Sequence, residues 1–528
     1  MYQQCTRINV KSYSHPPFFD TMTLAIEMKD ITVTFPGVIA NDKIYFSLQK
    51  GEIHGLLGEN GAGKSVLMKT LYGMHRPDEG KIIVNGSEVR IDNPSTAIKL
   101  GIGMVHQHFM LVPHLTVAEN IILGHEPTTN KILLDTKKIN KDLSEFCDQY
   151  NLCIDLKSPI YTLPVGMQQR VEILKALYRG ADILILDEPT SVLTPQEVEE
   201  LFKAVEVLKN QGKTIVFISH KLKEVLEICD NITVLRKGKV VGTVKASETN
   251  QNELAKMMVG RKVKLSYKKE EATKDKIVLK IENLEAVNDV GIPALKGVNL
   301  NVNVSEILGI AGVQGNGQTE LVEVITGLRK ATVGKIILDS ENITGISPKD
   351  RLKMGISYIP EDRQKRGLIS DFSVMENLIL GSQDSPSFSN NKFRINFSKV
   401  IDFAKKLIKD FSIKTPDKDT KVRYLSGGTQ QRVVVAREFS RNPKLIIAAQ
   451  PTRGLDVGAT EYVHNKLIEM REQGSAILLL SADLDEIWML SDRIAVIFEG
   501  KIVATEDLRK TNRRKIGLLM AGASLEND

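Results

Sequence analysis

The stretch that decides the fold is Gly58-Glu-Asn-Gly-Ala-Gly-Lys-Ser65. It follows an apolar segment, Glu52-Ile-His-Gly-Leu-Leu57, and precedes a helical pattern over Val66 to Tyr72. Glycines at this spacing let backbone N–H groups curl around an anion, and the start of a helix adds partial positive charge. The pattern therefore predicts a loop that binds nucleotide phosphates between a strand and a helix.

Two side chains in this loop carry most of the expected chemistry. We expect Lys64 to reach the β- and γ-phosphates and the Ser65 hydroxyl to ligate Mg²⁺. The other residues of the loop that we expect to contact the nucleotide are Gly58, Asn60, Gly61 and Gly63.

The second half of the chain repeats the first at a nearly constant spacing. The loop recurs 254 residues later as Gly312-Val-Gln-Gly-Asn-Gly-Gln-Thr319, and the segment that ends in Gln107 recurs at the same offset, ending in Glu361. Two later segments recur at an offset of 262, so an insertion of eight residues (262 − 254) separates the two registers. These segments are Leu163-Pro-Val-Gly-Met-Gln-Gln-Arg170, matched by Leu425-Ser-Gly-Gly-Thr-Gln-Gln-Arg432, and Ile183-Leu-Ile-Leu-Asp-Glu-Pro-Thr190, matched by Leu445-Ile-Ile-Ala-Ala-Gln-Pro-Thr452. We interpret the halves as duplicated domains.

Short apolar segments alternate with helical patterns in both halves. The first half has them at Ile183 to Leu186 and Thr214 to Ile218, and the second half at Leu445 to Ala448 and Ala476 to Leu480. Short buried strands alternating with helices predict an α/β fold with a parallel, doubly wound sheet.

The domain boundaries follow from this repeat and from a change in composition. Arg261 to Lys276 is charged and nearly free of apolar residues, which favours a solvated linker. We expect nucleotide-binding domains over 22–263 and 276–520, a linker over 264–275 and a tail over 521–528. We interpret residues 1–21 as a disordered tail, or as the product of a start codon placed before Met22.

Composition excludes several classes of protein. Hydrophobic residues make up 42% and charged residues 26% of the 528 positions, which is typical of a globular chain and not of a disordered or fibrous one. The longest apolar runs are about five residues, against roughly 18 for a membrane span. A net charge of +6, from 71 basic and 65 acidic residues, is a small imbalance and only weak evidence for nucleic-acid binding. The four cysteines match neither a zinc site nor a redox pair, as expected of reduced thiols in a cytosolic protein.

Further candidate residues lie where the apolar strands of the first half end. Asp187 is placed to hold Mg²⁺, and Glu188 to orient or deprotonate an attacking water. His220 ends the third strand and is a candidate γ-phosphate contact, while Gln107 is a candidate γ-phosphate sensor and metal ligand. Phe35, before Pro36-Gly37, is placed either to stack on adenine or to pack in the core.

These elements, in this order, resemble the ATP-binding subunits of ABC transporters over residues 24–520. The most distinctive segment is Leu425-Ser-Gly-Gly-Thr-Gln-Gln-Arg432, which looks like the signature motif of that family. The resemblance implies two tandem P-loop NTPase domains, each with a parallel-sheet core and a helical signature subdomain. It also implies ATP and Mg²⁺ as cofactors.

In that family two nucleotide-binding domains close head to tail, so each ATP lies between the phosphate loop of one and the signature of the other. The resemblance therefore implies that Ser426, Gly427 and Gly428 contact the γ-phosphate, and Asp456 looks like the Asp of the family's D-loop.

The departures from the family pattern are complementary. The first half keeps its phosphate loop, acids and histidine but has a poor signature, with Pro164, Val165 and Met167 in place of Ser, Gly and Gln. Proline removes both the hydroxyl and an N–H donor. The second half keeps its signature and lacks the other groups, with Gln318, Ala449, Gln450 and Ala482 in place of Lys, Asp, Glu and His. We expect one competent composite site and one degenerate site that hydrolyses little or no ATP.

The resemblance also extends to a class of transporter. A fused pair of domains without membrane spans resembles the ATPase of bacterial carbohydrate-type importers. Three segments look like those of the nucleoside group, which works with a basic membrane lipoprotein. They are Val105-His-Gln-His-Phe-Met-Leu-Val-Pro113, Val165 to Leu177 and Ala448-Ala-Gln-Pro-Thr-Arg-Gly-Leu-Asp456. The alternatives are the ATPase of a ribose- or galactose-type importer, a soluble twin-ABC translation factor and a nucleotide-gated scaffold.

The importer interpretation implies partners and a location. We expect two different integral-membrane permease chains and an extracytoplasmic solute-binding lipoprotein in the complex. Segments near Gln107 and Glu361 are expected to push on short helices of the permease. The protein would then be peripheral, at the cytoplasmic face of the cell membrane, and would bind no nucleic acid.

Overall fold

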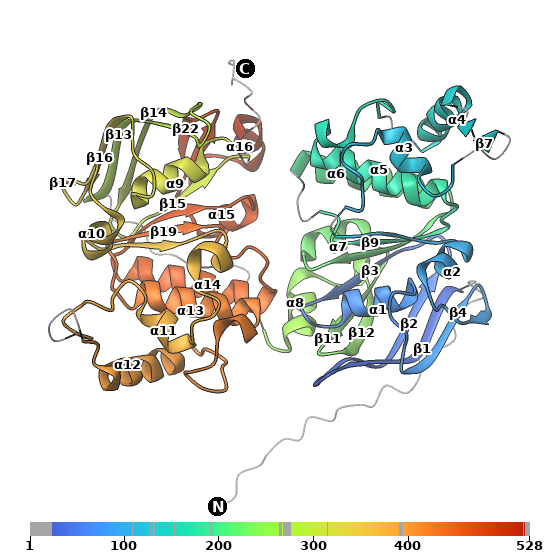
Figure 1. Ribbon diagram of the computed structural model, residues 1–528, viewed down its shortest axis with the longest axis horizontal. Helices are drawn as coiled ribbons and strands as arrows, with labels where there is room; N and C mark the ends of the chain where they lie inside the picture. Colours follow the sequence, from blue (N-terminus) through green and yellow to red (C-terminus); the bar gives the residue numbers. More distant parts are fainter. Residues whose placement is uncertain are drawn as a thin grey trace, which may run out of the picture. The chain divides into compact units, whose positions relative to one another are not determined.

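The computed structural model describes most of the chain as two compact units, which meet in sequence at Arg261 and Lys262 (Figure 1). The described residues are 24–107, 109–126, 128–129, 133–134, 136–150, 152, 154–190, 193, 195–262, 267, 276–313, 315–389, 394–520 and 522. The expected tail over 1–21 lies outside them, as do the expected linker except Tyr267 and the expected tail over 521–528 except Gly522.

The first unit contains an antiparallel sheet and a larger, mostly parallel sheet. The antiparallel sheet has the order β2-β1-β4-β5, with β1 at Leu24–Phe35, β2 at Val38–Gln49, β4 at Glu79–Val84 and β5 at Ser87–Val89. The larger sheet has the order β12-β11-β3-β10-β9-β6, in which only the β11–β12 pairing is antiparallel. Its strands are β3 Ile53–Gly58, β6 Ile102–Val105, β9 Ile183–Asp187, β10 Thr214–Ser219, β11 Asn231–Arg236 and β12 Lys239–Lys245. A short pair, β7 Thr128–Thr129 and β8 Leu133–Leu134, stands apart.

The second unit repeats both sheets. Its antiparallel sheet has the order β14-β13-β16-β17, with β13 at Ile277–Val287, β14 at Pro293–Asn303, β16 at Val333–Leu338 and β17 at Glu341–Asn342. Its larger sheet, β18-β19-β20-β15-β21-β22, has the same connectivity as the first. The strands are β15 Ile307–Ala311, β18 Ile356–Ile359, β19 Leu445–Ala449, β20 Ala476–Leu480, β21 Arg493–Phe498 and β22 Lys501–Asp507. The predicted duplication and α/β fold class are confirmed.

Helices cover the sheets in the same sequence in both units. The first unit has α1 Lys64–Leu71, α2 Pro94–Lys99, α3 Val117–Ile122, α4 Thr136–Gln149, α5 Val165–Tyr178, α6 Pro195–Asn210, α7 Leu222–Ile228 and α8 Gln251–Val259. The second has α9 Gln318–Thr326, α10 Pro348–Lys353, α11 Val374–Ile379, α12 Phe397–Asp410, α13 Gly427–Phe439, α14 Val457–Glu472, α15 Leu484–Leu490 and α16 Arg513–Met520. A π-helical turn, Arg363–Gly367, follows β18.

The layering explains why the central strands read as unbroken apolar runs. Along β19, Leu445 and Ile447 belong to a core cluster shared with α9 and the antiparallel sheet. The residues between them, Ile446 and Ala448, belong to a cluster shared with α13 and α14. Successive side chains of a strand point to opposite faces, so a strand buried on both faces needs apolar residues throughout. The loops that follow these strands then gather at one edge of the sheet.

Among the described residues, every helix is too short or too polar to span a lipid bilayer.

Candidate nucleotide site

The phosphate loop of the first unit runs from β3 into α1 with a backbone that requires glycine. Gly61 and Gly63 have φ values of 80° and 101°, in the left-handed region that other residues rarely adopt. A Cβ atom on Gly63 would lie 2.4 Å from the carbonyl oxygen of Ala40. The buried Asn41 amide donates a hydrogen bond of 3.2 Å to the Gly63 carbonyl and holds the loop against β2.

Lys64 begins α1, and its side chain folds back over the loop. The ammonium Nζ donates hydrogen bonds to the carbonyl oxygens of Gly58 at 2.7 Å and Glu59 at 3.1 Å. The lysine is buried, so its charge stands in a poorly solvated place at the positive end of a helix. This arrangement suits the binding of a polyphosphate.

At its described residues, the matching loop of the second unit has similar glycine backbone angles and lacks the charge. Gly315 and Gly317 have φ values of 94° and 100°. The Gln318 amide donates a hydrogen bond of 2.8 Å to the Gly312 carbonyl, as Lys64 does to Gly58. Gln318 thus reproduces the contact that shapes the loop and lacks the cation that would bind phosphate.

Two of the three expected metal ligands, Ser65 and Asp187, come together at the end of β9, whereas the third, Gln107, contacts Glu188. The Ser65 hydroxyl lies 3.5 Å from a carboxylate oxygen of Asp187. Burial, and then the neighbouring charge of Glu188, raise the pKa of Asp187. A bound cation would favour the ionised form of this carboxylate, and hydroxyl and carboxylate oxygens are the ligands that Mg²⁺ prefers. Ser65 and Asp187 therefore fit a Mg²⁺ ion that is also held by phosphate oxygens.

Glu188 receives two side chains from neighbouring strand ends. Its own backbone is fixed by a hydrogen bond of 3.0 Å from its N–H to the Ile218 carbonyl, with a left-handed φ of 48°. His220 Nδ1 lies 3.0 Å from one carboxylate oxygen, and the Gln107 amide donates to the other at 3.0 Å. The hydrogen bond from His220 holds the pKa of Glu188 below its usual range. Three residues singled out in the sequence thus meet at one carboxylate.

We expect His220→Ala to move the acid limb of the pH–rate profile for ATP hydrolysis to higher pH. A lowered pKa keeps the Glu188 carboxylate ionised to lower pH, so losing the His220 hydrogen bond makes it protonate earlier as the pH falls. Measuring kcat across the acid range checks this. His220→Asn, which keeps an amide donor, should restore part of the shift. A uniform loss of kcat with an unmoved acid limb would contradict the prediction.

The second unit keeps the backbone geometry of this site but lacks its carboxylate and imidazole side chains. Gln450 has a left-handed φ of 47°, and its N–H donates to the Leu480 carbonyl at 2.7 Å, as Glu188 does to Ile218. Ala449 and Ala482 stand where the first unit has Asp187 and His220. The losses are in the side chains and not in the fold.

The signature residues of the second unit lie at the start of α13. The Ser426 hydroxyl caps the helix, 3.4 Å from the Thr429 N–H, and Gly427 and Gly428 form its first turn. Asp456 caps α14, accepting from the Ala459 N–H at 2.7 Å, and a Cβ on Gly428 would lie 4.0 Å from its carboxylate. The expected signature and D-loop residues are therefore neighbours. In the first unit, α5 begins after Pro164, which provides no side-chain cap.

The sequence analysis missed Arg363, which lies beside the signature. Its guanidinium donates to the Arg453 carbonyl at 2.9 Å, and a Cβ on Gly427 would lie 2.6 Å from its Nη2. Arg453 in turn pairs with Glu361. Arg363 stands only two residues after Glu361, but 64 residues separate it from Gly427, so no local pattern reveals the contact.

Phe35 lies at the end of β1 with its side chain outside the core. It is 41% exposed and meets the ring of His75 edge-on, with ring centroids 5.5 Å apart. The core-packing alternative is therefore wrong, and stacking on adenine stays a prediction.

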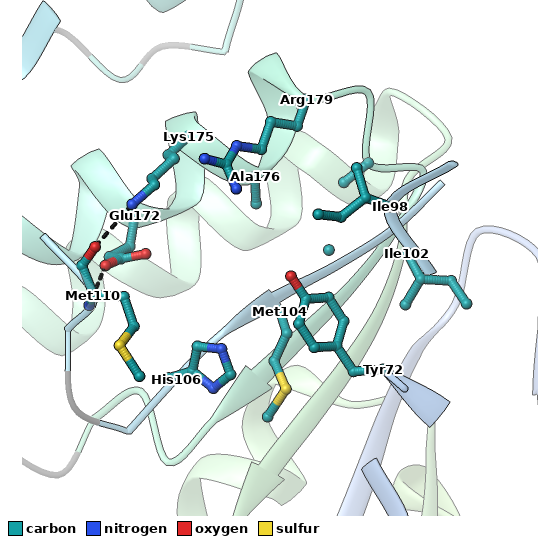
Figure 2. Close-up of a pocket in the computed structure, with 12 residues that line it drawn as sticks. Tyr72, Ile98, Ile102, Met104, His106, Met110, Glu172, Lys175, Ala176 and Arg179 are labelled. Atoms are coloured by element: carbon teal, nitrogen blue, oxygen red, sulfur yellow. Dashed lines mark hydrogen bonds between the residues drawn. The ribbon is translucent and has the colours of Figure 1, made fainter. Parts of the chain in front are cut away.

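A cavity of about 90 Å³ lies next to this site in the first unit, where the segment after Gln107 meets α5 (Figure 2). Glu172 accepts a hydrogen bond of 2.5 Å from the Met110 N–H, and Lys175 donates one of 2.8 Å to the Met110 carbonyl. Burial raises the pKa of Glu172 and lowers that of Lys175. Figure 2 shows both side chains directed from α5 to the Met110 backbone, with Tyr72 and His106 on the opposite wall. The loop that carries Gln107 is thereby tied to α5.

The second unit ties the equivalent loop with different groups. Arg437 donates to the Gly367 carbonyl at 2.8 Å and pairs with Glu438 at 2.7 Å. Glu438 also pairs with Arg441 at 2.9 Å. The two units therefore present different side chains at corresponding places.

The protein-family model described as ABC transporter matches residues 41–191 and 295–453, which together are more than half of the chain. The chain belongs to the ABC transporter family and is an ATPase with two tandem cassettes, as the sequence predicted.

Relatives of known name match over nearly the full length. The guanosine import ATP-binding protein NupO of Bacillus subtilis is 50% identical, covering 95% of this chain and 98% of that protein. The nucleoside import ATP-binding protein NupA of Lactococcus lactis is 46% identical, covering 95% and 98%. The glucose import ATP-binding protein TsgD13 of Haloferax volcanii is 44% identical, covering 94% and 96%.

Among solved structures, an archaeal ribosome recycling factor in complex with a ribosomal stalk protein matches with a TM-score of 0.63. It is 22% identical, and the match covers 94% of this chain and 92% of that one. This likeness supports the twin-cassette fold and nothing about function.

Proposed function

We propose that this protein is the ATP-hydrolysing subunit of a nucleoside importer, with one competent composite ATP site. The observation that carries the proposal is that the candidate hydrolytic residues lie in the first unit and the complete signature lies in the second. In the first unit, Lys64 lies on the phosphate loop, the Ser65 hydroxyl lies near Asp187, and His220 and Gln107 contact Glu188. The complete signature stands in the second unit, at the start of α13.

Each residue of the competent site has a proposed part in hydrolysis. Lys64 binds the β- and γ-phosphates, and Glu188 orients the attacking water while His220 and Gln107 hold its carboxylate in place. Ser65 and Asp187 would hold a Mg²⁺ ion together with the nucleotide, and the ion would supply positive charge to the phosphates. Ser426, Gly427 and Gly428 contact the γ-phosphate from the second unit when ATP closes the pair, with Asp456 beside them.

The other composite site would bind nucleotide weakly and hydrolyse little or none. It would combine the neutral loop of Gln318 with the signature position of the first unit, where Pro164 stands. Loss of a catalytic carboxylate costs roughly 10²–10⁴ in rate, and this site also lacks the lysine and the metal-site acid. We propose a hinge or regulatory role for it.

The assignment to nucleosides rests on relatives. Proteins named for guanosine and nucleoside import are 50% and 46% identical over nearly the whole chain, and one named for glucose import is 44% identical. A monosaccharide importer is therefore the second candidate.

The proposed partners are two different permease chains in the membrane and an extracytoplasmic solute-binding lipoprotein. The proposal of different permease chains rests on the two halves differing in sequence along the segments after Gln107 and Glu361. We place the protein at the cytoplasmic face of the membrane, with domains over 22–263 and 276–520 joined by a linker over 264–275.

Deleting the gene should lower uptake of radiolabelled guanosine, adenosine and uridine at least about tenfold, because a permease without its ATPase cannot drive accumulation. Uptake is measured in cells, with labelled ribose and galactose in parallel. Complementation with the wild-type gene should restore nucleoside uptake, whereas the Glu188→Gln gene should not. Loss of sugar uptake with intact nucleoside uptake would assign the protein to the second candidate function.

A further inference from the structure

A carboxylate occupies the start of α5, the helix that takes the place of the signature helix in the first unit. The Gly166 N–H donates a hydrogen bond of 3.3 Å to Oε1 of Glu197. A Cβ on Gly166 would lie 2.5 Å from the same oxygen, so this carboxylate is seated directly on the first turn. Glu197 comes from α6 and lies 31 residues away in sequence. The contact therefore depends on how α6 packs against α5.

The second unit has a methyl group at the matching place. At the offset of 262 residues, Gly166 corresponds to Gly428 and Glu197 to Ala459. A Cβ on Gly428 would lie 3.0 Å from the Ala459 Cβ, with the Asp456 carboxylate only at 4.0 Å. The first turn of the intact signature helix thus faces a small apolar side chain, where the degenerate one faces a negative charge.

The chemistry of the two helix starts is opposite as a result. Both α5 and α13 are long enough, at 14 and 13 residues, to carry a partial positive charge at their first turn. In α13 that charge and the glycine N–H groups are available to an incoming anion. In α5 the Gly166 N–H already has a carboxylate acceptor.

We propose that Glu197 further weakens nucleotide binding at the degenerate composite site, because its carboxylate occupies the N–H that a γ-phosphate takes at an intact signature. The inference rests on the proposed function, in which the start of α5 faces the nucleotide of the degenerate site. A phosphate there must displace the carboxylate or lie beside its negative charge. Because hydrogen bonds to charged groups are strong, the expected penalty on nucleotide affinity is about 10- to 100-fold.

A local role for Glu197 makes a different prediction. Thr194-Pro-Gln-Glu197 has the residue types of a helix capping box, although Thr194 lies outside the described residues. A glutamine serves a capping box as well as a glutamate does. Glu197 also lines a cavity of about 140 Å³ between α5 and α6, so an amide of the same size fits. Glu197→Gln therefore removes the charge, keeps the volume and would serve a capping box equally well.

The first experiment measures nucleotide binding in the assembled transporter with Glu188→Gln as the background, which stops turnover. Labelled ATP is titrated and the affinities of the first and second nucleotides are fitted, with and without Glu197→Gln. We expect the second nucleotide to bind at least about tenfold more tightly in the Glu197→Gln variant. An unchanged second affinity overturns the inference. If the Glu188→Gln protein without the Glu197→Gln change failed to bind a first nucleotide tightly, the proposed function would be refuted instead.

The second experiment moves the carboxylate to the intact signature. Ala459→Glu is compared with Ala459→Gln, which has nearly the same size and no charge. We expect Ala459→Glu to raise the KM for ATP at least about tenfold relative to Ala459→Gln. Equal KM values for the two variants would mean that bulk alone matters, and would overturn the inference. Because Glu197→Gln is a neutral isostere in the other unit, its result stands even if Ala459→Glu fails to fold.

Discussion

Glu188→Gln is expected to lower the rate of ATP hydrolysis by the assembled transporter roughly 10²–10⁴-fold. The amide keeps the volume and removes the negative charge that accepts contacts from His220 Nδ1 and Gln107 Nε2, both at 3.0 Å. Glutamine is also the residue found at the corresponding position of the second unit, where Gln450 has a φ of 47° against 48° for Glu188. Steady-state phosphate release, with the permease and solute-binding protein present, measures the effect.

The matched control restores the acid to the second unit. Gln450→Glu should leave hydrolysis by the Glu188→Gln protein at its lowered level. The second site would still lack the lysine, the metal-site aspartate and the histidine, because Gln318, Ala449 and Ala482 stand at those positions. Recovery of hydrolysis in this double variant would show that the second site needs only its base. Substantial turnover by Glu188→Gln alone would refute the proposal of a single competent site.

Lys64→Gln is expected to weaken ATP binding about 10- to 100-fold. The ammonium offers a charge-assisted contact to phosphate worth roughly 1.5–3 kcal/mol, and glutamine offers a neutral one. The loop should keep its shape, because Gln318 makes the same hydrogen bond to the Gly312 carbonyl, at 2.8 Å, that Lys64 makes to Gly58 at 2.7 Å. Nucleotide titration of the assembled complex gives the change in affinity.

The folding control for this variant is its melting temperature without nucleotide. It should stay within a few degrees of the wild-type value, since Gln318 makes the corresponding hydrogen bond to the loop carbonyl in the second unit. Unchanged ATP affinity would mean that the backbone N–H groups alone bind the phosphates. That result would also remove one of the differences between the two units on which the competent-site assignment rests.

Much of the candidate site could be predicted because parallel strands order their carboxyl ends. Gln107, Glu188 and His220 follow β6, β9 and β10, which pair directly as β10-β9-β6. Residues just after neighbouring parallel strands must lie at one edge of the sheet, so sequence position is enough to bring them together. The sequence pattern could not predict that His220 and Gln107 each contact a different oxygen of the Glu188 carboxylate.

Contacts between helices and distant loops could not be predicted in this way. Arg363 reaches Gly427 across 64 residues, and Glu197 reaches Gly166 across 31. Each contact depends on the packing of one helix or turn against another, which varies continuously with side-chain size and has no short repeating pattern. The exposed ring of Phe35 belongs to the same class, because an aromatic residue next to Pro-Gly is compatible with either the surface or the core.

The amino-acid sequence was sufficient for the duplication, the α/β class, the phosphate loop and the complementary loss of side chains between the halves. These are properties of residue identity and spacing along the chain, which local backbone geometry converts directly into strands, turns and helix starts. Only the tertiary structure revealed that the degenerate phosphate loop keeps its shape through Gln318, and that Glu197 is seated on Gly166. Both depend on which groups meet when α/β layers pack together, and that is decided by the whole fold rather than by any one segment.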